Sequence, residues 1–251
     1  MRRTWLAVLI LPVAAAMAVP ATAASAVSAA SAASAAPKAA AATARVAASQ
    51  PVLWPGARGS AVRNLQRRLA ELKYYPGAVD GQFGTSLEEA VWAFQETQGL
   101  PGENQVTAAF WRALAHPRAP KVLVPRGGGM RIEISLAREV LVLYNHNQVE
   151  LISHVSTGGH YYYCTRGGCG YAVTPTGNFR TRSFMPGWVT VPLGYMFNPV
   201  FFIGTAFAIH GDVPVPLQPV SHGCVRIPMD IAAFFHKLIR VPGTPVYIRN
   251  Y

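Results

Sequence analysis

Long apolar runs are scarce in this sequence of 251 residues. The one candidate, from Trp5 to Val19, contains Pro12 and is shorter than the roughly 20 residues that a membrane-spanning helix needs. Basic residues precede it at Arg2-Arg3 and small residues follow it, which is typical of a secretory signal peptide. We therefore expect residues 1–26 to be a signal peptide, and the exported chain to have no stable membrane span.

The export route and the cleavage position have alternatives. Both Ala21-Thr22-Ala23 and Ala24-Ser25-Ala26 fit the small-residue pattern of a cleavage site. Arg2-Arg3 is compatible with twin-arginine export, although the strongly apolar run fits ordinary secretion better. An uncleaved membrane anchor is the alternative to a signal peptide.

Acidic residues are also few, since 11 Asp and Glu accompany 22 Lys and Arg and the formal net charge is +11. A basic exported protein suits an anionic partner such as a cell-wall polymer or a membrane surface. The sequence lacks a clustered run of Lys or Arg, and together with the export signal this argues against nucleic acid as the partner. We expect an extracytoplasmic protein associated with the cell wall.

Cysteine is rarer still, with three residues in the chain. Cys164 and Cys169 are separated by a short segment with two glycines, so we expect a disulfide between them in an oxidising compartment. A zinc site is the alternative, but it needs more ligands than this segment offers. Cys224 is then left over, which is where a reactive thiol is expected.

The first half of the chain changes from low complexity to a helical pattern. Residues 27–52 are rich in Ala and Ser and lack aromatic residues, so we expect a flexible spacer. Residues 53–117 carry apolar residues at helical spacing and predict three short helices. The first is expected to be capped by Ser60, the second by a capping box at Ser86, and the third to begin near Thr107. No acid, base or metal cluster appears there, which favours a structural or binding module.

After a linker over residues 118–129, the apolar period changes to two. Alternation from Arg131 to Leu136 predicts a half-buried strand, and a single strand is expected from Phe201 to His210. One helix is predicted from about Asp230 to Ile239. Residues 130–251 are therefore expected to form a mainly β domain.

A cysteine and two histidines lie close together in this domain. They belong to His210-Gly211 and to Ser221-His222-Gly223-Cys224-Val225-Arg226. A cysteine acts as a nucleophile in its thiolate form, and a nearby imidazole or positive charge lowers the pKa of the thiol. We therefore expect Cys224 to be a nucleophile, against the alternative of a buried, inert thiol.

Spacing alone leaves the general base undecided between the two histidines. His222 and Cys224 are two residues apart, so their side chains share a face in an extended segment, whereas His210 ends a predicted strand. Gly211 and Gly223 permit unusual backbone angles and close approach of a substrate. A zinc site of His210, His222 and Cys224 is a further alternative, although no recognised metal-site spacing accompanies them.

Five short motifs follow one another in the helical segment: Leu65-Gln66, Asp80-Gly81-Gln82-Phe83-Gly84, Ala90-Val91, Phe94-Gln95 and Gly99-Leu100. With these motifs, residues 53–117 resemble the peptidoglycan-binding domain of bacterial wall enzymes. The segment departs from that family at residues 101–106, where the family usually repeats an Asp-Gly turn. The resemblance implies peptidoglycan as a partner.

The C-terminal half resembles the catalytic domain of bacterial L,D-transpeptidases from about Met130 to Ile248. The motifs that carry this resemblance are His210-Gly211, the segment from Ser221 to Arg226, and Thr174-Pro175-Thr176-Gly177-Asn178-Phe179. It implies a multidomain fold that is α plus mainly β. A small three-helix bundle would precede a β-sandwich-like catalytic domain, residues 130–251, with one C-terminal helix.

The same resemblance implies a role for each residue of the site. Cys224 would be the nucleophile and His210 the general base, oriented by the backbone carbonyl of Gly211. Backbone N–H groups of His222, Gly223 and Cys224 would form the oxyanion hole. Ser221 and Arg226 would shape the loop or hold a substrate carboxylate, with a structural ion pair as the alternative for Arg226.

The implied reaction is acyl transfer in peptidoglycan, of the penicillin-insensitive type. Cys224 would take the acyl group of a donor tetrapeptide stem and release D-Ala, and a side-chain amine of an acceptor stem would then form a 3→3 cross-link. Neither step needs a metal or another cofactor. A carboxypeptidase that trims stems and a non-catalytic wall-binding protein are the alternatives, and the sequence predicts no oligomeric state.

Overall fold

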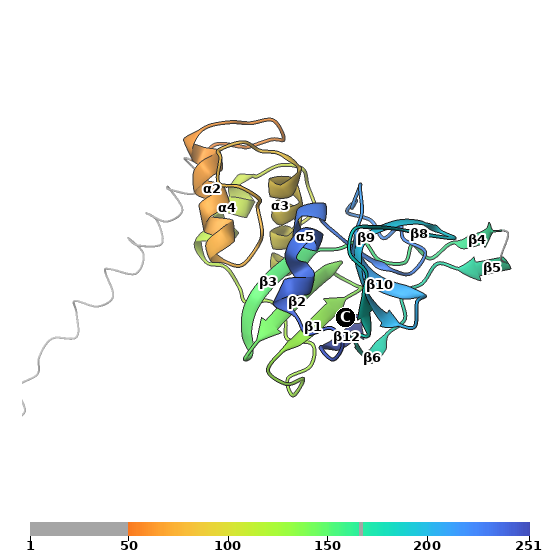
Figure 1. Ribbon diagram of the computed structural model, residues 1–251. Coiled ribbons are helices and arrows are strands. Elements are labelled where there is room, and N and C mark those ends of the chain that lie inside the picture. Colours follow the sequence, from red (N-terminus) through yellow and green to blue (C-terminus); the bar gives the residue numbers. More distant parts are fainter. Residues whose placement is uncertain (1–49, 166–167) are drawn as a thin grey trace, which may run out of the picture. The chain divides into compact units, whose positions relative to one another are not determined.

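The computed structural model describes residues 50–165 and 168–251, so the expected signal peptide and most of the expected spacer lie outside the described residues. The described residues all belong to one compact unit, Ala41–Tyr251. No helix within them is long and apolar enough to cross a membrane. The unit begins with three helices, α2 (Ser60–Glu71), α3 (Thr85–Gln98) and α4 (Ala108–Ala115) (Figure 1).

The three helices surround a core of apolar and aromatic side chains. Leu65 of α2, Phe94 of α3 and Phe110 of α4 are almost fully buried, and the rings of Phe94 and Phe110 lie 4.7 Å apart. The buried amide of Gln66 donates to Asp80 Oδ1 at 2.9 Å and accepts from the Gly81 N–H at 2.8 Å. The Leu-Gln and Asp-Gly motifs are therefore one physical unit, in which a helix side chain holds the following turn.

Both predicted helix caps are wrong. Helix α2 begins after Gly59 and α3 after Gly84, and neither start has a side-chain cap. The Gly59 carbonyl accepts the N–H of Arg63, the first hydrogen bond of α2. Gly59 has φ of 118°, a backbone angle that glycine adopts readily, so backbone conformation rather than a side-chain cap defines the start of this helix. The third helix was predicted to begin near Thr107, which is confirmed, and Thr107 Oγ1 caps it by accepting the N–H of Phe110.

The first sheet contains, in spatial order, β3 (Gln148–His154), β2 (Val140–Asn145), β1 (Arg131–Ser135), β12 (Pro245–Arg249) and β6 (Gly177–Arg180). Strand β1 pairs with β12 in parallel, and the other neighbours are antiparallel. The last strand of the chain therefore lies inside the sheet, between β1 and β6 (Figure 1).

Strand β1 is buried on both faces, so the expected half-buried strand is wrong. Ile132 and Ile134 face the core between the two sheets. On the other face, Arg131 Nε lies 2.6 Å from Glu133 Oε1, and the N–H of Leu123 in the preceding segment donates to Glu133 Oε2 at 2.6 Å. Buried charges are tolerated when they are paired and hydrogen-bonded, which alternation alone does not reveal.

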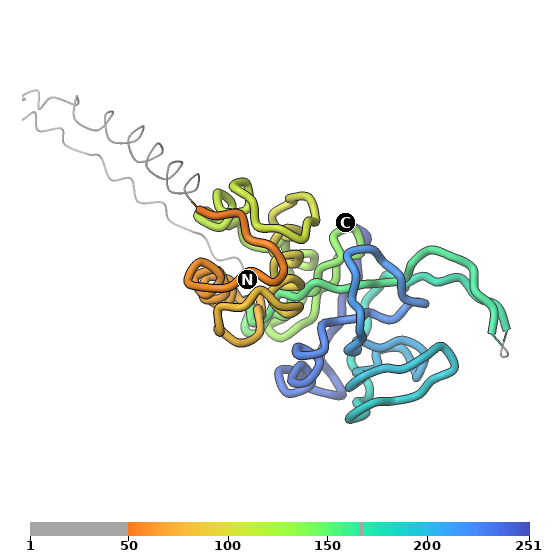
Figure 2. The backbone as a smooth tube through the Cα atoms, turned by 90° about the horizontal axis from the view of Figure 1, so that it is seen from above, coloured from red at the N-terminus to blue at the C-terminus, as the bar shows by residue number. Residues whose placement is uncertain are grey.

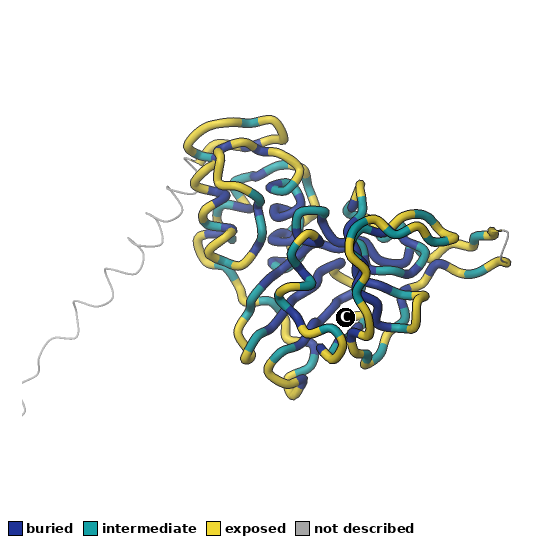
Figure 3. The backbone as a smooth tube through the Cα atoms, in the orientation of Figure 1, coloured by how far each residue is buried: buried dark blue, intermediate teal, exposed yellow. Residues whose placement is uncertain are grey.

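One face of the first sheet packs against the helices. Val142 of β2 and Ile152 of β3 belong to the same buried cluster as Leu87 and Phe94 of α3. At the edge of the sheet, the N–H of Ile152 donates to the carbonyl oxygen of Lys73 at 2.8 Å. Both α3 and the neighbouring strands carry buried residues where they pack together (Figure 3).

The second sheet contains β11 (Val225–Ile227), β10 (Phe207–Gly211), β9 (Gly194–Ile203) and β7 (Ser183–Phe184), with β8 (Trp188–Val191) also paired to β9. The single strand expected from Phe201 to His210 is wrong. It is the antiparallel pair β9–β10, and the chain reverses at Gly204, whose φ is +49°. An apolar run with one glycine does not distinguish a strand from a tight hairpin.

Both sheets and the last helix, α5 (Met229–Leu238), share one core. Val246 of the first sheet, Ile209 and Val225 of the second, and Phe235 of α5 are all nearly fully buried in it. This confirms the mainly β, sandwich-like domain with one C-terminal helix. Strands β4 (Tyr162–Thr165) and β5 (Gly168–Tyr171) form a hairpin that projects from this body in both views (Figures 1 and 2).

Candidate active site

Strands β10 and β11 bring the predicted site residues together. They pair in parallel, with Ile209 opposite Val225 and His210 opposite Arg226, and Cys224 directly precedes β11. Ile209 and Val225 face the main core, whereas Ala208 and Cys224 pack in a separate small cluster on the other face. Because side chains alternate along a strand, His210 lies on the same face as Ala208 and Cys224.

His210 is held in one tautomer by its own strand. Its ring is buried, and Nδ1 lies 2.9 Å from the carbonyl oxygen of Gly211. A carbonyl oxygen only accepts, so Nδ1 carries the proton and Nε2 of the neutral ring has a free lone pair. Burial lowers the pKa of His210, while the bond to Gly211 and the charge of Asp212 oppose this shift. His210 is therefore a neutral imidazole with a basic nitrogen available.

The thiol of Cys224 is protonated at rest. Burial raises its pKa, and the Ala208 backbone and the Arg226 charge oppose this only in part. Its Sγ donates to the carbonyl oxygen of Ala206 at 3.8 Å, although the residue keeps part of its surface accessible. A thiol in this state needs a neighbouring base to become a nucleophile, and His210 is on the same face.

Ser221 shapes the turn that carries the cysteine. Its buried hydroxyl donates to the Cys224 carbonyl at 2.6 Å and accepts from the Gly223 N–H at 3.0 Å. Its backbone is also fixed, because its N–H donates to the Thr157 carbonyl at 2.9 Å and its carbonyl accepts from Gly159 at 3.0 Å. The hydroxyl is thus fully used within the turn, in line with the loop-shaping alternative.

The turn requires glycine at position 223. Gly223 has φ of +138°, and a Cβ there would lie 2.6 Å from the Phe207 ring and 2.8 Å from the Val173 carbonyl. Its carbonyl accepts from Thr174 Oγ1 at 2.8 Å. Since the Gly223 N–H is bonded to Ser221, the N–H groups of His222 and Cys224 are the ones with no hydrogen bond to any described part of the chain.

Thr174 is a site residue whose role was not predicted, although it lies in the quoted Thr-Pro motif. Its buried hydroxyl bridges two segments, since it donates to Gly223 and accepts from the Gly158 N–H at 2.9 Å. Gly211 serves packing rather than an open approach. A Cβ there would lie 2.7 Å from the Ala232 side chain of α5.

Arg226 forms an ion pair, which was the structural alternative for this residue. Its Nε lies 2.9 Å from Asp212 Oδ2, and both side chains are partly exposed. Asp212 also accepts the N–H of Val213 at 2.8 Å. Asp212 was not predicted, and its position two residues after His210 in a chain poor in acids was the available signal.

His222 is turned toward the projecting hairpin. Its ring lies edge-on to Tyr163 at 4.6 Å and to Tyr161 at 5.6 Å. The Tyr161 hydroxyl donates to the Val220 carbonyl at 3.2 Å, so the start of the hairpin is attached to the segment just before the turn of Ser221 and Cys224. Burial, with a smaller effect of the Arg226 charge, lowers the pKa of His222.

The expected disulfide is present between Cys164 and Cys169, which face each other across β4 and β5. Within residues 50–165 and 168–251, no group of three or more His, Cys, Asp or Glu is arranged to hold a metal ion. The two zinc alternatives therefore find no ligand set there.

Comparisons with known proteins divide the chain in the same way. Residues 58–114 match a peptidoglycan binding domain family, and residues 129–248 match the L,D-transpeptidase catalytic domain family. A solved L,D-transpeptidase from Xylanimonas cellulosilytica is 30% identical, with a TM-score of 0.74, over 78% of this chain and 97% of that one. One from Stackebrandtia nassauensis is 20% identical, with a TM-score of 0.46, over 78% and 93%. No curated protein matches the chain.

Proposed function

Because the chain belongs to the L,D-transpeptidase family, we propose that it cross-links peptidoglycan stems through a thioester on Cys224. The observation that carries this proposal is the shared face of His210 and Cys224, with Nδ1 of His210 bonded to Gly211 and Nε2 left as a base. The helical segment matches a peptidoglycan-binding family and would hold the polymer near this site. Both matched domains act on the cell wall, so we infer an exported, extracytoplasmic protein.

In the first step, His210 Nε2 takes the thiol proton and the Cys224 sulfur attacks a carbonyl carbon of the donor stem. This carbonyl joins the L-centre of a diamino acid to the terminal D-Ala of a tetrapeptide. The oxyanion of the tetrahedral intermediate would accept hydrogen bonds from the N–H groups of His222 and Cys224. The Gly211 carbonyl would stabilise the imidazolium form of His210. The imidazolium then gives its proton to the leaving amine, the C–N bond breaks, and D-Ala departs.

In the second step, the side-chain amine of an acceptor stem attacks the thioester. His210 takes the proton of the amine, and the Cys224 thiolate leaves and is reprotonated by the imidazolium. The product is a 3→3 cross-link, and no external oxidant or cofactor is consumed. Attack by water at the same carbon would instead release a trimmed tripeptide, which is the carboxypeptidase alternative.

The test is to incubate the purified protein with tetrapeptide muropeptides and to analyse products and enzyme by mass spectrometry. Cross-linked dimers, together with a Cys224 adduct of the stem without its D-Ala, would support the transpeptidase. Trimmed tripeptides without dimers would replace it with the carboxypeptidase. The wall-binding alternative predicts no dimers, no trimmed tripeptides and no Cys224 adduct. The protein would then only bind peptidoglycan, which a pull-down on the insoluble polymer would detect.

A further inference from the structure

The segment Asp212–Val220 connects the strand of His210 to the turn of Cys224. Both ends of this connecting loop therefore reach the candidate active site. The loop is held from one side by the end of β3 and the residues after it. Ser156 Oγ donates to the Gln218 carbonyl at 2.8 Å and accepts from the Val220 N–H at 3.2 Å, and the ring nitrogen Nε2 of His154 lies 3.1 Å from the Pro216 carbonyl.

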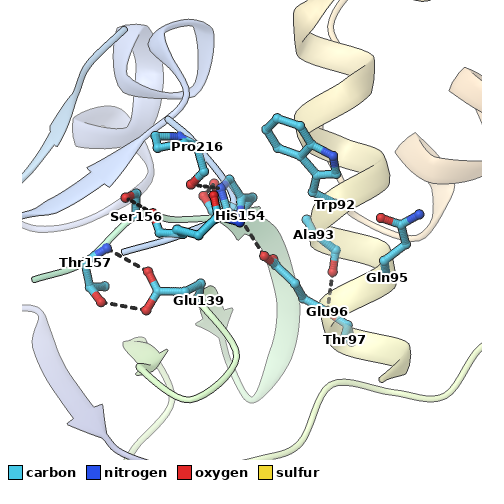
Figure 4. A network of polar contacts seen from close by, with 12 residues as sticks. Trp92, Ala93, Gln95, Glu96, Thr97, Glu139, His154, Ser156, Thr157 and Pro216 are labelled. Atoms are coloured by element: carbon cyan, nitrogen blue, oxygen red, sulfur yellow. Dashed lines mark hydrogen bonds and ion pairs between the residues drawn. The ribbon is translucent and has the colours of Figure 1, made fainter. Parts of the chain in front are cut away.

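His154 also reaches in the opposite direction, into the helical segment. Its ring is buried, and Nδ1 lies 2.8 Å from Oε1 of Glu96 in α3 (Figure 4). The indole of Trp92, one turn earlier in the same helix, packs edge-on at 5.4 Å from the imidazole. One side chain thus connects a helix of the peptidoglycan-binding segment to the loop between the two catalytic residues.

Hydrogen-bond chemistry fixes where the protons lie in this chain of contacts. The Pro216 carbonyl can only accept, so Nε2 of His154 carries a proton, and one further proton lies between Nδ1 and Glu96. Burial raises the pKa of Glu96 well above its usual value and lowers that of His154 to about 4, which favours a neutral acid and a neutral imidazole. Glu96 Oε2 is buried without a hydrogen-bond partner among the described residues, as suits the carbonyl oxygen of a neutral acid.

A second buried carboxyl group supports the same segment. Glu139 accepts the Thr157 N–H at 2.7 Å and the Thr157 hydroxyl at 2.6 Å (Figure 4). The Thr157 carbonyl in turn accepts the N–H of Ser221. The backbone of Glu139 has φ of +50°, a conformation that is unfavourable for a residue other than glycine. Such strain persists where the surroundings hold it, and here the two bonds to Thr157 do so.

We propose that Glu96 and His154 are positioning residues, through which helix α3 holds the loop Asp212–Val220 and so keeps His210 and Cys224 in register. This inference rests on the proposed acyl transfer, because it assigns the pair a role in that reaction. It makes the peptidoglycan-binding segment part of the support of the active site. Neither residue touches the reacting atoms, so they affect the rate of acylation through the positions of His210 and Cys224 and take no part in the transfer of the proton or the acyl group.

The test compares Glu96→Gln with Glu96→Ala. The glutamine amide can donate to Nδ1 and leaves a carbonyl oxygen in place of Oε2, so it imitates the neutral acid, whereas alanine leaves Nδ1 unpaired. We expect Glu96→Ala to lower kcat for cross-linking by about tenfold or more with little change in KM, and Glu96→Gln to stay within about twofold of the parent. Glu71→Ala, which removes an exposed carboxylate on α2, is the matched control and should change neither value.

Two further measurements do not depend on the cross-linking reaction. The rate of alkylation of Cys224 by iodoacetamide should fall in Glu96→Ala and recover in Glu96→Gln. In the parent protein, long-range proton–nitrogen NMR should show the proton of His154 on Nε2, with the signal identified by its loss in His154→Gln. If the parent protein alkylates normally but forms no dimers, the proposed function fails while the positioning test still stands.

The positioning proposal is overturned by any of three results. The first is a folded Glu96→Ala variant with parental alkylation and kcat. The second is an equal loss in Glu96→Gln and Glu96→Ala, and the third is a parental His154 with its proton on Nδ1 alone. Because the NMR measurement uses the parent protein, it decides the question even if Glu96→Ala does not fold.

Discussion

Nδ1 of His210 donates to the carbonyl oxygen of Gly211, the next residue of the same strand, at 2.9 Å. The third group of the proposed catalytic set is thus a backbone carbonyl rather than a carboxylate. It carries no charge, so it orients the imidazole without raising its pKa as strongly as an aspartate would.

Replacing the base should separate the two histidines. We expect His210→Gln to lower the rate of acylation of Cys224 by about a hundredfold to ten-thousandfold, because a glutamine cannot take the thiol proton. His222→Gln should retain much of the activity, because its ring packs on Tyr161 and Tyr163. Mass spectrometry of the Cys224 adduct over time measures both rates. The opposite ranking would reassign the base to His222.

The acid limb of the pH profile should report the buried imidazole. Acylation requires neutral His210, so kcat/KM should fall as the pH drops through the pKa of His210 in the free enzyme. Burial lowers that pKa, and the midpoint should therefore lie below the ordinary value of 6.5. A midpoint above 6.5 would contradict the buried, neutral base described for this site.

Alkylation should distinguish the three cysteines. Without reductant, iodoacetamide should label Cys224 alone, and the rate should increase with pH because burial raises the pKa of this thiol. Cys164 and Cys169 should label only after reduction. The Cys224→Ser variant is the control and should take up no label before reduction. Labelling of all three cysteines without reductant would rule out the disulfide.

Gly223 and Gly194 form a matched pair of glycine positions. Both have positive φ, +138° and +133°, but a Cβ at Gly194 meets nothing within 4 Å whereas one at Gly223 meets Phe207 and Val173. Gly194→Ala should cost about 1–2 kcal/mol of unfolding free energy from backbone strain alone. Gly223→Ala should cost more and should abolish acylation, as measured by urea unfolding and the Cys224 adduct. Equal costs would show that the turn around Cys224 can yield.

Buried Glu89 of α3 should make the protein less stable as the pH rises. Burial, together with the charges of Asp230 and Glu88, raises its pKa from 4.5 to about 8, so the folded state binds the proton more tightly than the unfolded state. The contribution of this group to stability is complete below about pH 4.5 and is lost as the pH increases to about 8. Urea unfolding between pH 5 and pH 8 should show a smaller decrease in Glu89→Gln than in the parent. Exposed Glu71→Gln should leave the decrease unchanged.

The sequence predicted the residues that are near one another in the chain or in a strong motif. Cys224 and His210 were singled out from short motifs, and Cys224 also because it is the one cysteine left after Cys164 and Cys169 pair. The structure places Cys224 and His210 on one face of a sheet. The disulfide between Cys164 and Cys169 was predictable for the same reason, since few residues separate the partners.

The missed features depend on contacts between distant segments. Glu96 and His154 are 58 residues apart, and nothing in either segment indicates that a helix side chain meets the end of a strand. Strand β1 was expected to be half exposed because polar residues alternate with apolar ones along it. In the structure the polar face is buried as well, because Arg131 pairs with Glu133 and the preceding segment covers them. Local periodicity records which faces are apolar, but it does not record which polar faces find partners.

The apolar cluster that joins Val142 and Ile152 to the side chains of α3 limits how far the helical segment can move relative to the sheet. A wall-binding module on a slack tether samples a range of distances, and the length of the tether sets the effective concentration of substrate. Here the module and the sheet are packed together, so polymer held by the helices would be offered to Cys224 at one fixed offset. The distance between the site where the polymer is bound and the stem that reacts at Cys224 would then be set by the fold.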